Sequence, residues 1–317
     1  MKFASLGHLD YESRLKQLPK DWIHEKFIVS PEINCDGTKG YLIALKFSAQ
    51  KLMNLPRENI QQNILDLVLF AQDELDVEII QLGALTTSVT SGGAWLVEQK
   101  EYKGFVNHGD SYTAAVTCKV VEKALDLFGK KSSNQVLAIV GAYGIIGEAV
   151  SRVIVPKFAH SILIGRREEK LQELKEKIQG NFDTTTELKT KDADIIVTAT
   201  SHPKALLESN HLKENAIVVD VSQPPNLSQD VCRKRSDIHR FDGGYVAFPF
   251  NFQLPGMPPG KLFACIAEVI MQAKENERKN HVGSIDLKHL MKTEEWAKKY
   301  QFELKELTNF GKTISQI

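Results

Sequence analysis

Three glycines, each three residues after the last, stand in the stretch VGAYGIIGEA, directly after the apolar run VLAIV and before an amphipathic segment. In a turn from a strand into a helix, the first glycine permits a tight turn, the second admits a pyrophosphate, and the third allows close helix packing. The N-terminus of the helix then offers free N–H groups to the phosphates. An ordinary glycine-rich turn of an α/β domain is the alternative. The pattern predicts dinucleotide contacts at Gly141, Tyr143, Gly144, Ile145, Ile146 and Gly147.

Two arginines follow the next apolar run, in SILIGRREEKL. An NAD enzyme usually has an acidic residue at this position to bind the ribose hydroxyls. Guanidinium groups instead form bidentate pairs with a 2′-phosphate. We therefore predict that Arg166 and Arg167 bind NADPH. The alternative is that they are solvated helix-start residues paired with Glu168 or Glu169.

Polar side chains also end two further apolar runs, TATS and VVDVSQPPN. The carboxyl ends of parallel strands line a cofactor crevice, so Thr200 and Ser222 are predicted on its nicotinamide side. For Asp220 a role in stabilising the turn is an equally good interpretation.

A single cysteine is the candidate nucleophile. Pro258 and Pro259 are expected to start a helix in PPGKLFACIAEVI, and Cys265 lies at the edge of its apolar stripe, where it can face a cleft. A place near the helix N-terminus favours the thiolate form. The alternative is that Cys265 is a small buried hydrophobe, as most lone cysteines are. Cys118 is a weaker candidate, because it falls in the middle of a core stripe.

Short apolar runs that alternate with helical segments from residue 135 onward indicate a parallel sheet with helices on both faces. The predicted fold class is α/β, a Rossmann-type parallel sheet domain inserted between an N-terminal α+β substrate domain and C-terminal helices. The expected boundaries are 1–130 for the N-terminal α+β substrate domain, 131–247 for the NADP-binding domain, and 248–317 for helices that pack back on the substrate domain.

Within the N-terminal part, 27–33 and 40–47 are expected to be strands, and Pro56 is expected to open an amphipathic helix. The stretch TTSVTSGG is interpreted as a loop at a strand end. A helix over 108–130 carries a capping residue at its start and Gly129 after its end.

Composition excludes several classes of protein. The 40 basic and 40 acidic residues cancel, so no global field favours nucleic acid or an acidic membrane. No apolar run reaches transmembrane length, and the start becomes polar too soon for a signal peptide. Four scattered cysteines favour neither a disulfide framework nor a metal site, and they suggest the cytoplasm.

Motifs along nearly the whole chain resemble those of one family, the long-chain acyl-[acyl-carrier-protein] reductases. These are aldehyde-forming enzymes best known from cyanobacteria. The motifs are FASLGHL, LGALTTS, GDSYTAAVTCKVVE, GAYGIIGEAV, ADIIVTATS, VVDVSQPPNL, DGGYVAF and KLFACIAEVI. The glycine turn and TATS also occur in glutamyl-tRNA and shikimate reductases, whereas GDSYTA and FACIAE together are more specific. Tyr112 stands where cyanobacterial members tend to have histidine, and Tyr143 and Ile145 stand where they have Thr and Asp.

The resemblance implies an NADPH-dependent enzyme that reduces a fatty acyl thioester to a fatty aldehyde, and the family's nucleophile falls on Cys265. It implies acyl carrier protein or acyl-CoA as the substrate, and an aldehyde-consuming enzyme as a further partner. Ser111 and Tyr112 are candidate catalytic donors to the oxyanion. The alternatives are a shikimate-dehydrogenase-like oxidoreductase acting on a small polar substrate, and a non-enzymatic NADP-binding protein.

Overall fold

The computed structural model describes residues 1–9, 12–202, 204–254 and 256–314. The chain forms two compact units. The first unit comprises Met1–Gly109 and Cys265–Ile285, and the second comprises Asp110–Ala264 and Asp286–Ile317. The chain therefore passes from one unit to the other three times.

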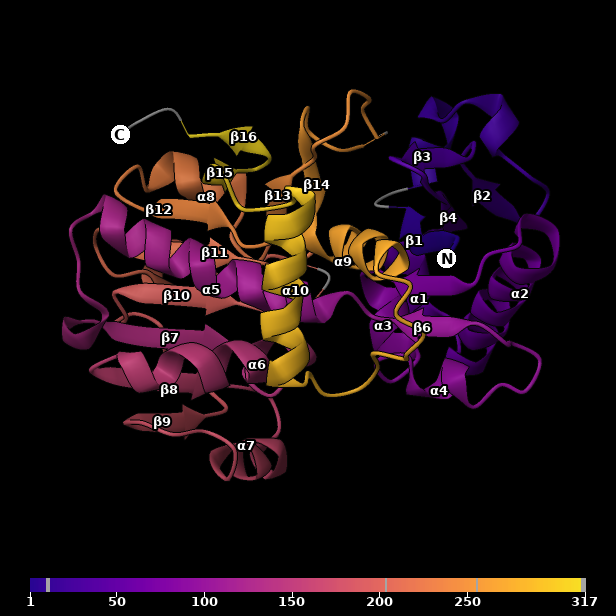
Figure 1. Cartoon of the computed structure of the whole chain (residues 1–317). Coiled ribbons are helices and arrows are strands. Elements are labelled where there is room, and N and C mark those ends of the chain that lie inside the picture. The colour runs from indigo at the N-terminus through magenta and orange to yellow at the C-terminus, as the bar shows by residue number, and fades with distance from the viewer. Residues whose placement is uncertain (10–11, 203, 255, 315–317) are drawn as a thin grey trace. The chain divides into compact units, whose positions relative to one another are not determined.

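Six parallel strands form the main sheet of the second unit, in the order β12-β11-β10-β7-β8-β9 (Figure 1). Their bounds are Val136–Val140 for β7, His160–Ile164 for β8, Phe182–Thr185 for β9, Ile195–Thr198 for β10, Ile217–Asp220 for β11 and His239–Asp242 for β12. The first strand of the unit lies in the middle, and the strand order reverses between β7 and β10. This is the doubly wound order of the Rossmann fold, so the predicted fold class is confirmed.

Helices and two small hairpins complete the second unit. The helices are α5 (Asp110–Leu127), α6 (Ile145–Ile154), α7 (Glu168–Lys175), α8 (Gln229–Lys234) and α10 (Leu287–Tyr300), with short 3-10 turns at Ser132–Asn134, Val155–Lys157 and Ser209–His211. The hairpins pair β13 (Tyr245–Ala247) with β14 (Lys261–Phe263), and β15 (Thr308–Asn309) with β16 (Lys312–Thr313). Helices α5 and α6 lie against one another and contact the sheet, and α10 crosses α5 (Figure 1).

A second sheet, in the order β2-β4-β1-β5-β6 with β3 paired to β4, forms the first unit. Its strands are β1 (Phe3–Leu9), β2 (Phe27–Val29), β3 (Ile33–Cys35), β4 (Thr38–Ser48), β5 (Ile79–Leu82) and β6 (Phe105–Asn107). The run β4-β1-β5-β6 is parallel, while β2 and β3 pair antiparallel with β4. The helices are α1 (Ala49–Asn54), α2 (Arg57–Leu75), α3 (Leu85–Val89), α4 (Ala94–Val97) and α9 (Ala264–Lys274), with 3-10 turns at Glu12–Gln17 and Lys20–Trp22.

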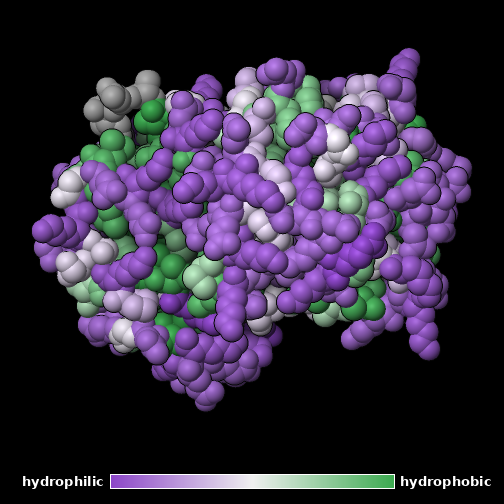
Figure 2. Space-filling model, viewed as in Figure 1, coloured by the Kyte–Doolittle hydropathy of each residue, from purple (hydrophilic) through white to green (hydrophobic). Residues whose placement is uncertain are grey.

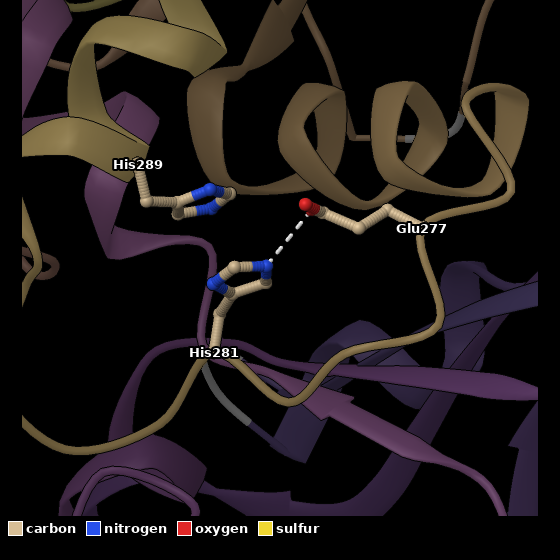
Figure 3. Close-up of side chains that lie close together, drawn as sticks. All are labelled: Glu277, His281 and His289. Atoms are coloured by element: carbon tan, nitrogen blue, oxygen red, sulfur yellow. Dashed lines mark hydrogen bonds and ion pairs between the residues drawn. The ribbon is translucent and has the colours of Figure 1, made fainter.

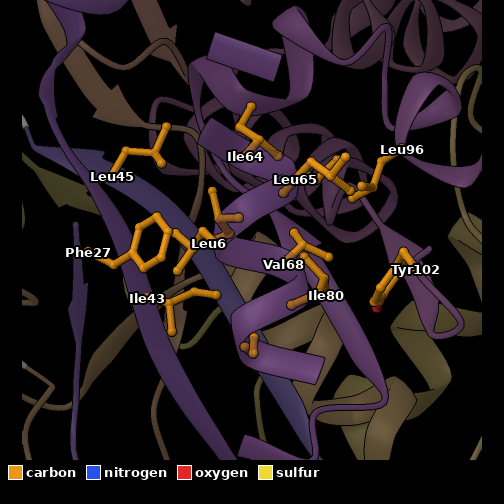
Figure 4. Packing of buried hydrophobic residues seen from close by; sticks show 14 of the residues in the cluster. Leu6, Phe27, Ile43, Leu45, Ile64, Leu65, Val68, Ile80, Leu96 and Tyr102 are labelled. Atoms are coloured by element: carbon orange, nitrogen blue, oxygen red, sulfur yellow. The ribbon is translucent and has the colours of Figure 1, made fainter. Parts of the chain in front are cut away.

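Helix α2 supplies one side of the core of the first unit. It begins directly after Pro56, as predicted, and buries Ile64 and Val68 against Leu6 and Ile80 of the sheet (Figure 4). The face shown in Figure 2 is mostly hydrophilic, and its hydrophobic side chains form small separate groups. None of the helices in the described ranges is both long and apolar enough to cross a membrane.

Two local predictions were wrong. The stretch expected to be a loop contains helix α3, whose hydroxyls bond to backbone carbonyls; Thr86 Oγ1, for example, donates to the carbonyl of Gly83 at 2.7 Å. The helix expected from Pro258 begins only at Ala264, because 261–263 pair as β14 with 245–247. The later start places Cys265 in the first turn of α9.

The division into units also differs from the expected boundaries. The passage between units lies at Gly109/Asp110 rather than near residue 130, because α5 packs against α6 and α10 of the second unit. Only 265–285 of the expected C-terminal part belong to the first unit, and α10 belongs to the second.

A buried charged cluster joins three strand ends of the second unit. Arg240 Nη2 donates to Asp220 at 3.3 Å, and Arg240 Nη1 donates to Asp242 at 2.7 Å. The three side chains are at most 7% exposed. Asp220 also accepts hydrogen bonds from the Thr198 hydroxyl at 2.7 Å and the Leu227 N–H at 3.0 Å. Its contacts therefore fit the turn-stabilising interpretation.

We predict that Asp220→Asn lowers the free energy of unfolding by about 2–4 kcal/mol, because it removes the charge facing a buried guanidinium and puts an amide donor against another donor. Urea unfolding of the full chain measures the change. Asp230→Asn is the control, because it breaks an ion pair between Asp230 and Arg233, two side chains that are each more than 70% exposed. This variant should lower the free energy of unfolding by less than about 0.5 kcal/mol. Equal losses in the two variants would contradict the importance of the buried cluster.

Candidate functional site

The glycine turn is built so tightly that side chains are excluded at its first and third glycines. Gly141 has φ +89°, and a Cβ there would lie 2.3 Å from the carbonyl oxygen of Ala199. A Cβ on Gly147 would lie 2.1 Å from the carbonyl oxygen of Gly141. Gly144 closes the turn by donating its N–H to Gly141 at 2.9 Å. Gly141 and Gly147 therefore meet a steric demand at the turn and at the helix start.

This turn stands where a dinucleotide binds in such sheets. It follows β7, beside the end of β10, at the point where the strand order reverses. Ile145 and Ile146 are the first residues of α6, and both are half-buried. The first N–H groups of a helix have no acceptor within it, so they are available to phosphates. The cradle fits a pyrophosphate, and the contacts of its six predicted residues stay predictions.

The loop from β8 to α7 carries the two arginines, and both are exposed. Arg167 Nε lies 3.9 Å from Glu169 Oε1, but both side chains are more than half exposed, so this ion pair adds little stability. Arg166 forms no ion pair with any residue of the described ranges. The paired-arginine alternative thus describes Arg167 better than Arg166. Within the described ranges, Arg166 is thus the arginine of this loop whose charge is not paired with a carboxylate.

Thr200 and Ser222 form one hydrogen-bonded group at the ends of β10 and β11. The Thr200 N–H donates to Ser222 Oγ at 3.0 Å, and both hydroxyls donate to Asn226 Oδ1, at 2.7 and 3.0 Å. The Thr200 methyl carbon would lie 3.0 Å from a Cβ on Gly141. The structure therefore brings Thr200 against the glycine turn. Ser222 is 3% exposed and accepts a hydrogen bond from the backbone of Thr200. Sequence reasoning missed Asn226, which ends the quoted motif VVDVSQPPN.

Cys265 is the second residue of α9 and is half-buried. Its neighbour in the first unit is Gly109, which has φ +71°. A Cβ on Gly109 would lie 2.5 Å from Cys265 Cβ and 2.7 Å from Cys265 Cα. Only glycine permits this close approach. Cys265 thus lies in the first turn of α9, near the positive end of the helix dipole.

A buried amide pair holds this region together. Asn107 Nδ2 donates to Gln272 Oε1 at 2.5 Å, and Asn107 Oδ1 accepts the N–H of Gly109 at 2.5 Å. Both amide side chains are fully buried. After α9 the chain returns beside β6, where His281 Nε2 lies 3.0 Å from Glu277 Oε2 (Figure 3). Sequence reasoning missed Asn107, Gly109 and Gln272. Asn107 and Gln272 are 165 residues apart, and no local pattern links them, or Gly109 to Cys265.

Ser111 and Tyr112 lie in the first turn of α5, in the second unit, and are 2% and 1% exposed. The Tyr112 hydroxyl donates to the carbonyl of Phe302 at 2.7 Å. Burial raises the pKa of the Tyr112 phenol, and Glu303 and Glu294 raise it further. The hydroxyl thus anchors α5 to the segment after α10, and catalytic roles for Ser111 and Tyr112 stay predictions.

Comparisons with known proteins agree with the fold of the second unit. Residues 122–242 match the shikimate / quinate 5-dehydrogenase family. A long-chain acyl-[acyl-carrier-protein] reductase from Synechococcus elongatus is 30% identical over 181 residues, which are 54% of this chain and 52% of that protein. The match thus spans about half the length of this relative.

Solved structures resemble the chain more distantly. Shikimate dehydrogenase from Aquifex aeolicus has 12% identity and a TM-score of 0.44, covering 92% of this chain and 96% of that one. Glutamyl-tRNA reductase from Methanopyrus kandleri has 17% identity and a TM-score of 0.35, covering 59% of this chain and 43% of that one. The strand order and the family match together identify the second unit as a nicotinamide-dinucleotide-binding domain of the oxidoreductase type.

The four cysteines should differ in reactivity. Burial raises the pKa of the Cys35 and Cys118 thiols to about 12, and it also raises the pKa of Cys232. At about pH 7.5 a thiol with such a pKa has fewer than about one thiolate in 10,000 molecules. We predict that brief treatment with iodoacetamide labels Cys265 first, then Cys232, and leaves Cys35 and Cys118 unmodified. Peptide mass mapping gives the order, and early labelling of Cys118 would contradict it.

Proposed function

We propose that this protein is an NADPH-dependent reductase that converts a fatty acyl thioester into a fatty aldehyde through a thioester on Cys265. One observation carries the proposal. A half-buried cysteine begins a helix and is approached closely by a glycine, in a chain that also holds a dinucleotide-binding domain. The similarity to an acyl-[acyl-carrier-protein] reductase supports the same conclusion.

Residues of the second unit would hold the cofactor. The N–H groups at the start of α6 would bind the pyrophosphate, and Arg166 with Arg167 would bind the 2′-phosphate. Thr200 and Ser222 would border the nicotinamide side. NADPH, when bound, would supply the hydride that converts a thioester carbonyl into an aldehyde.

Cys265 would supply the covalent chemistry. Its thiolate would attack the carbonyl carbon of the acyl thioester and form a new C–S bond, while the C–S bond to the carrier breaks. The carrier would leave as a thiolate, which then takes up a proton. After reduction, the C–S bond to Cys265 would break, the aldehyde would leave, and the thiolate would be restored. Donors to the oxyanion are needed, and Ser111 and Tyr112 are the proposed ones. The Tyr112 hydroxyl has one proton, so it would have to leave the carbonyl of Phe302 to donate to the oxyanion.

The substrate would be carried by acyl carrier protein or by coenzyme A, and an aldehyde-consuming enzyme would take the product. The alternative, a dehydrogenase acting on a small polar substrate, draws on the shikimate / quinate family match. That match covers 122–242, within the second unit, so it bears on the cofactor rather than on the substrate. A panel of acyl thioesters and small alcohols, assayed with NADPH and NADP⁺ respectively, separates the two functions.

We predict that the protein gains the mass of one acyl group when it is incubated with an acyl thioester without NADPH, and that Cys265→Ser abolishes the gain. Serine has nearly the same shape, but its hydroxyl is a far weaker nucleophile without an activating base. Intact-protein mass spectrometry measures the adduct, and aldehyde release measures turnover. The Ser variant should keep its fold and its NADPH binding.

Cys118→Ser is the matched control, because that thiol is buried in α5 and its pKa is raised to about 12. It should keep both the adduct and aldehyde release. Near wild-type aldehyde release by Cys265→Ser would show direct hydride transfer to bound substrate, and the covalent mechanism would be wrong.

Arg166→Ala tests the cofactor assignment. Loss of a charge-assisted pair with a 2′-phosphate should weaken NADPH binding by about 1.5–3 kcal/mol and leave NADH binding almost unchanged. Titration calorimetry with both cofactors measures this difference. Equal losses for the two cofactors would rule out the contact between Arg166 and the phosphate.

A further inference from the structure

Tyr143 connects the glycine turn to the loop that carries the two arginines. The residue lies in the turn itself, between Gly141 and Gly144. Its ring covers Gly165, where a Cβ would lie only 2.3 Å from Tyr143 Cε1 and 2.6 Å from Cδ1. Gly165 is buried and leaves room for the ring, so the two residues fit each other across the ends of neighbouring strands.

The same side chain contacts both residues that follow Gly165. The N–H of Arg166 donates to the Tyr143 hydroxyl at 3.2 Å. The Arg167 guanidinium carbon lies 5.5 Å from the centre of the Tyr143 ring, within the range of a cation–π interaction. One half-buried side chain therefore contacts three consecutive residues of the loop, two of which are exposed arginines.

These contacts bear on how the loop would bind an anion. A free arginine side chain loses rotamer entropy when it binds a phosphate. A backbone fixed at Arg166 and a guanidinium held over a ring at Arg167 reduce that loss, because the loop is ordered beforehand. Both contacts are directed from Tyr143 to the arginine loop, so the effect should be larger for the 2′-phosphate than for the rest of the cofactor.

We propose that Tyr143 is a positioning residue for cofactor specificity: it orders Arg166 and Arg167 for the 2′-phosphate and thereby favours NADPH over NADH. This inference rests on the proposed NADPH function. It adds a residue of the glycine turn, through its side-chain contacts with the arginine loop, as a determinant of the choice between the two cofactors.

The test uses two fragments, 2′,5′-ADP and 5′-AMP, which differ only in the 2′-phosphate. Calorimetry with the full chain gives the affinity ratio of the two for wild type, Tyr143→Ala and Tyr143→Phe. Tyr143→Ala should weaken 2′,5′-ADP binding by about 5- to 20-fold and 5′-AMP binding by less than about 2-fold. Tyr143→Phe keeps the ring under Arg167 and loses only the hydroxyl, so it should give a smaller loss, of about 2- to 5-fold.

A double-mutant cycle separates positioning from a general effect on the fold. In the background Arg166→Ala with Arg167→Ala, Tyr143→Ala should cause no further change in the ratio. Tyr102→Phe is the matched control, because it also removes a tyrosine hydroxyl bond, to the carbonyl of Phe105 at 2.9 Å, but in the first unit. It should leave the ratio unchanged.

The outcomes distinguish this inference from the proposed function. Wild-type protein that binds the two fragments equally would overturn both the NADPH assignment and the role of Tyr143. The role of Tyr143 alone would be overturned if the wild-type protein prefers 2′,5′-ADP and the Tyr143 variants keep that full preference. The same conclusion would follow if the variants lose affinity equally for both fragments.

Discussion

The carboxylate of Asp220 is the constraint on which the nucleotide-binding edge of this protein depends. It lies at the end of the fifth strand of its unit with no exposed surface, and it accepts hydrogen bonds from Thr198, Ser222, Leu227 and Arg240. A buried carboxylate without such partners would be strongly unfavourable. Two of the donors come from the neighbouring strands β10 and β12, and the other two come from the loop after β11. The carboxylate at the end of β11 therefore fixes the ends of β10, β11 and β12 relative to one another.

This fixed edge supports the glycine turn. Thr198 pairs in register with Val140, so the residues that follow them, Ala199 and Gly141, lie against each other. The carbonyl of Ala199 occupies the place that a side chain on Gly141 would need. Buried hydrogen bonds on one side of the turn and the packing of Tyr143 on Gly165 on the other leave its backbone few alternatives. A phosphate cradle gains affinity from such order, because less conformational entropy is lost on binding.

The first unit uses a neutral network for a similar purpose. Asn107 donates a buried hydrogen bond to Gln272 and accepts one from the N–H of Gly109, which lies directly against Cys265. Amides satisfy buried backbone groups without the desolvation cost of a charge. The cysteine helix is thereby attached to a strand far away in the sequence. Cys265 follows one passage of the chain between the units, and Gly109 precedes another.

The sequence by itself determined the features that depend on neighbours along the chain. Apolar runs located β7, β8, β10 and β11, and glycine spacing located the turn, because a tight turn and close packing require glycine whatever surrounds them. Arg166 and Arg167 were found because they directly follow a strand. Tertiary structure decided the rest. Pairing with 245–247 turned 261–263 into a strand, and packing on α6 and α10 assigned α5 to the second unit. Arg240 reaches Asp220, Gly109 reaches Cys265 and the arginine loop reaches Tyr143 from segments 20 or more residues away, and only the folded chain brings these groups into contact.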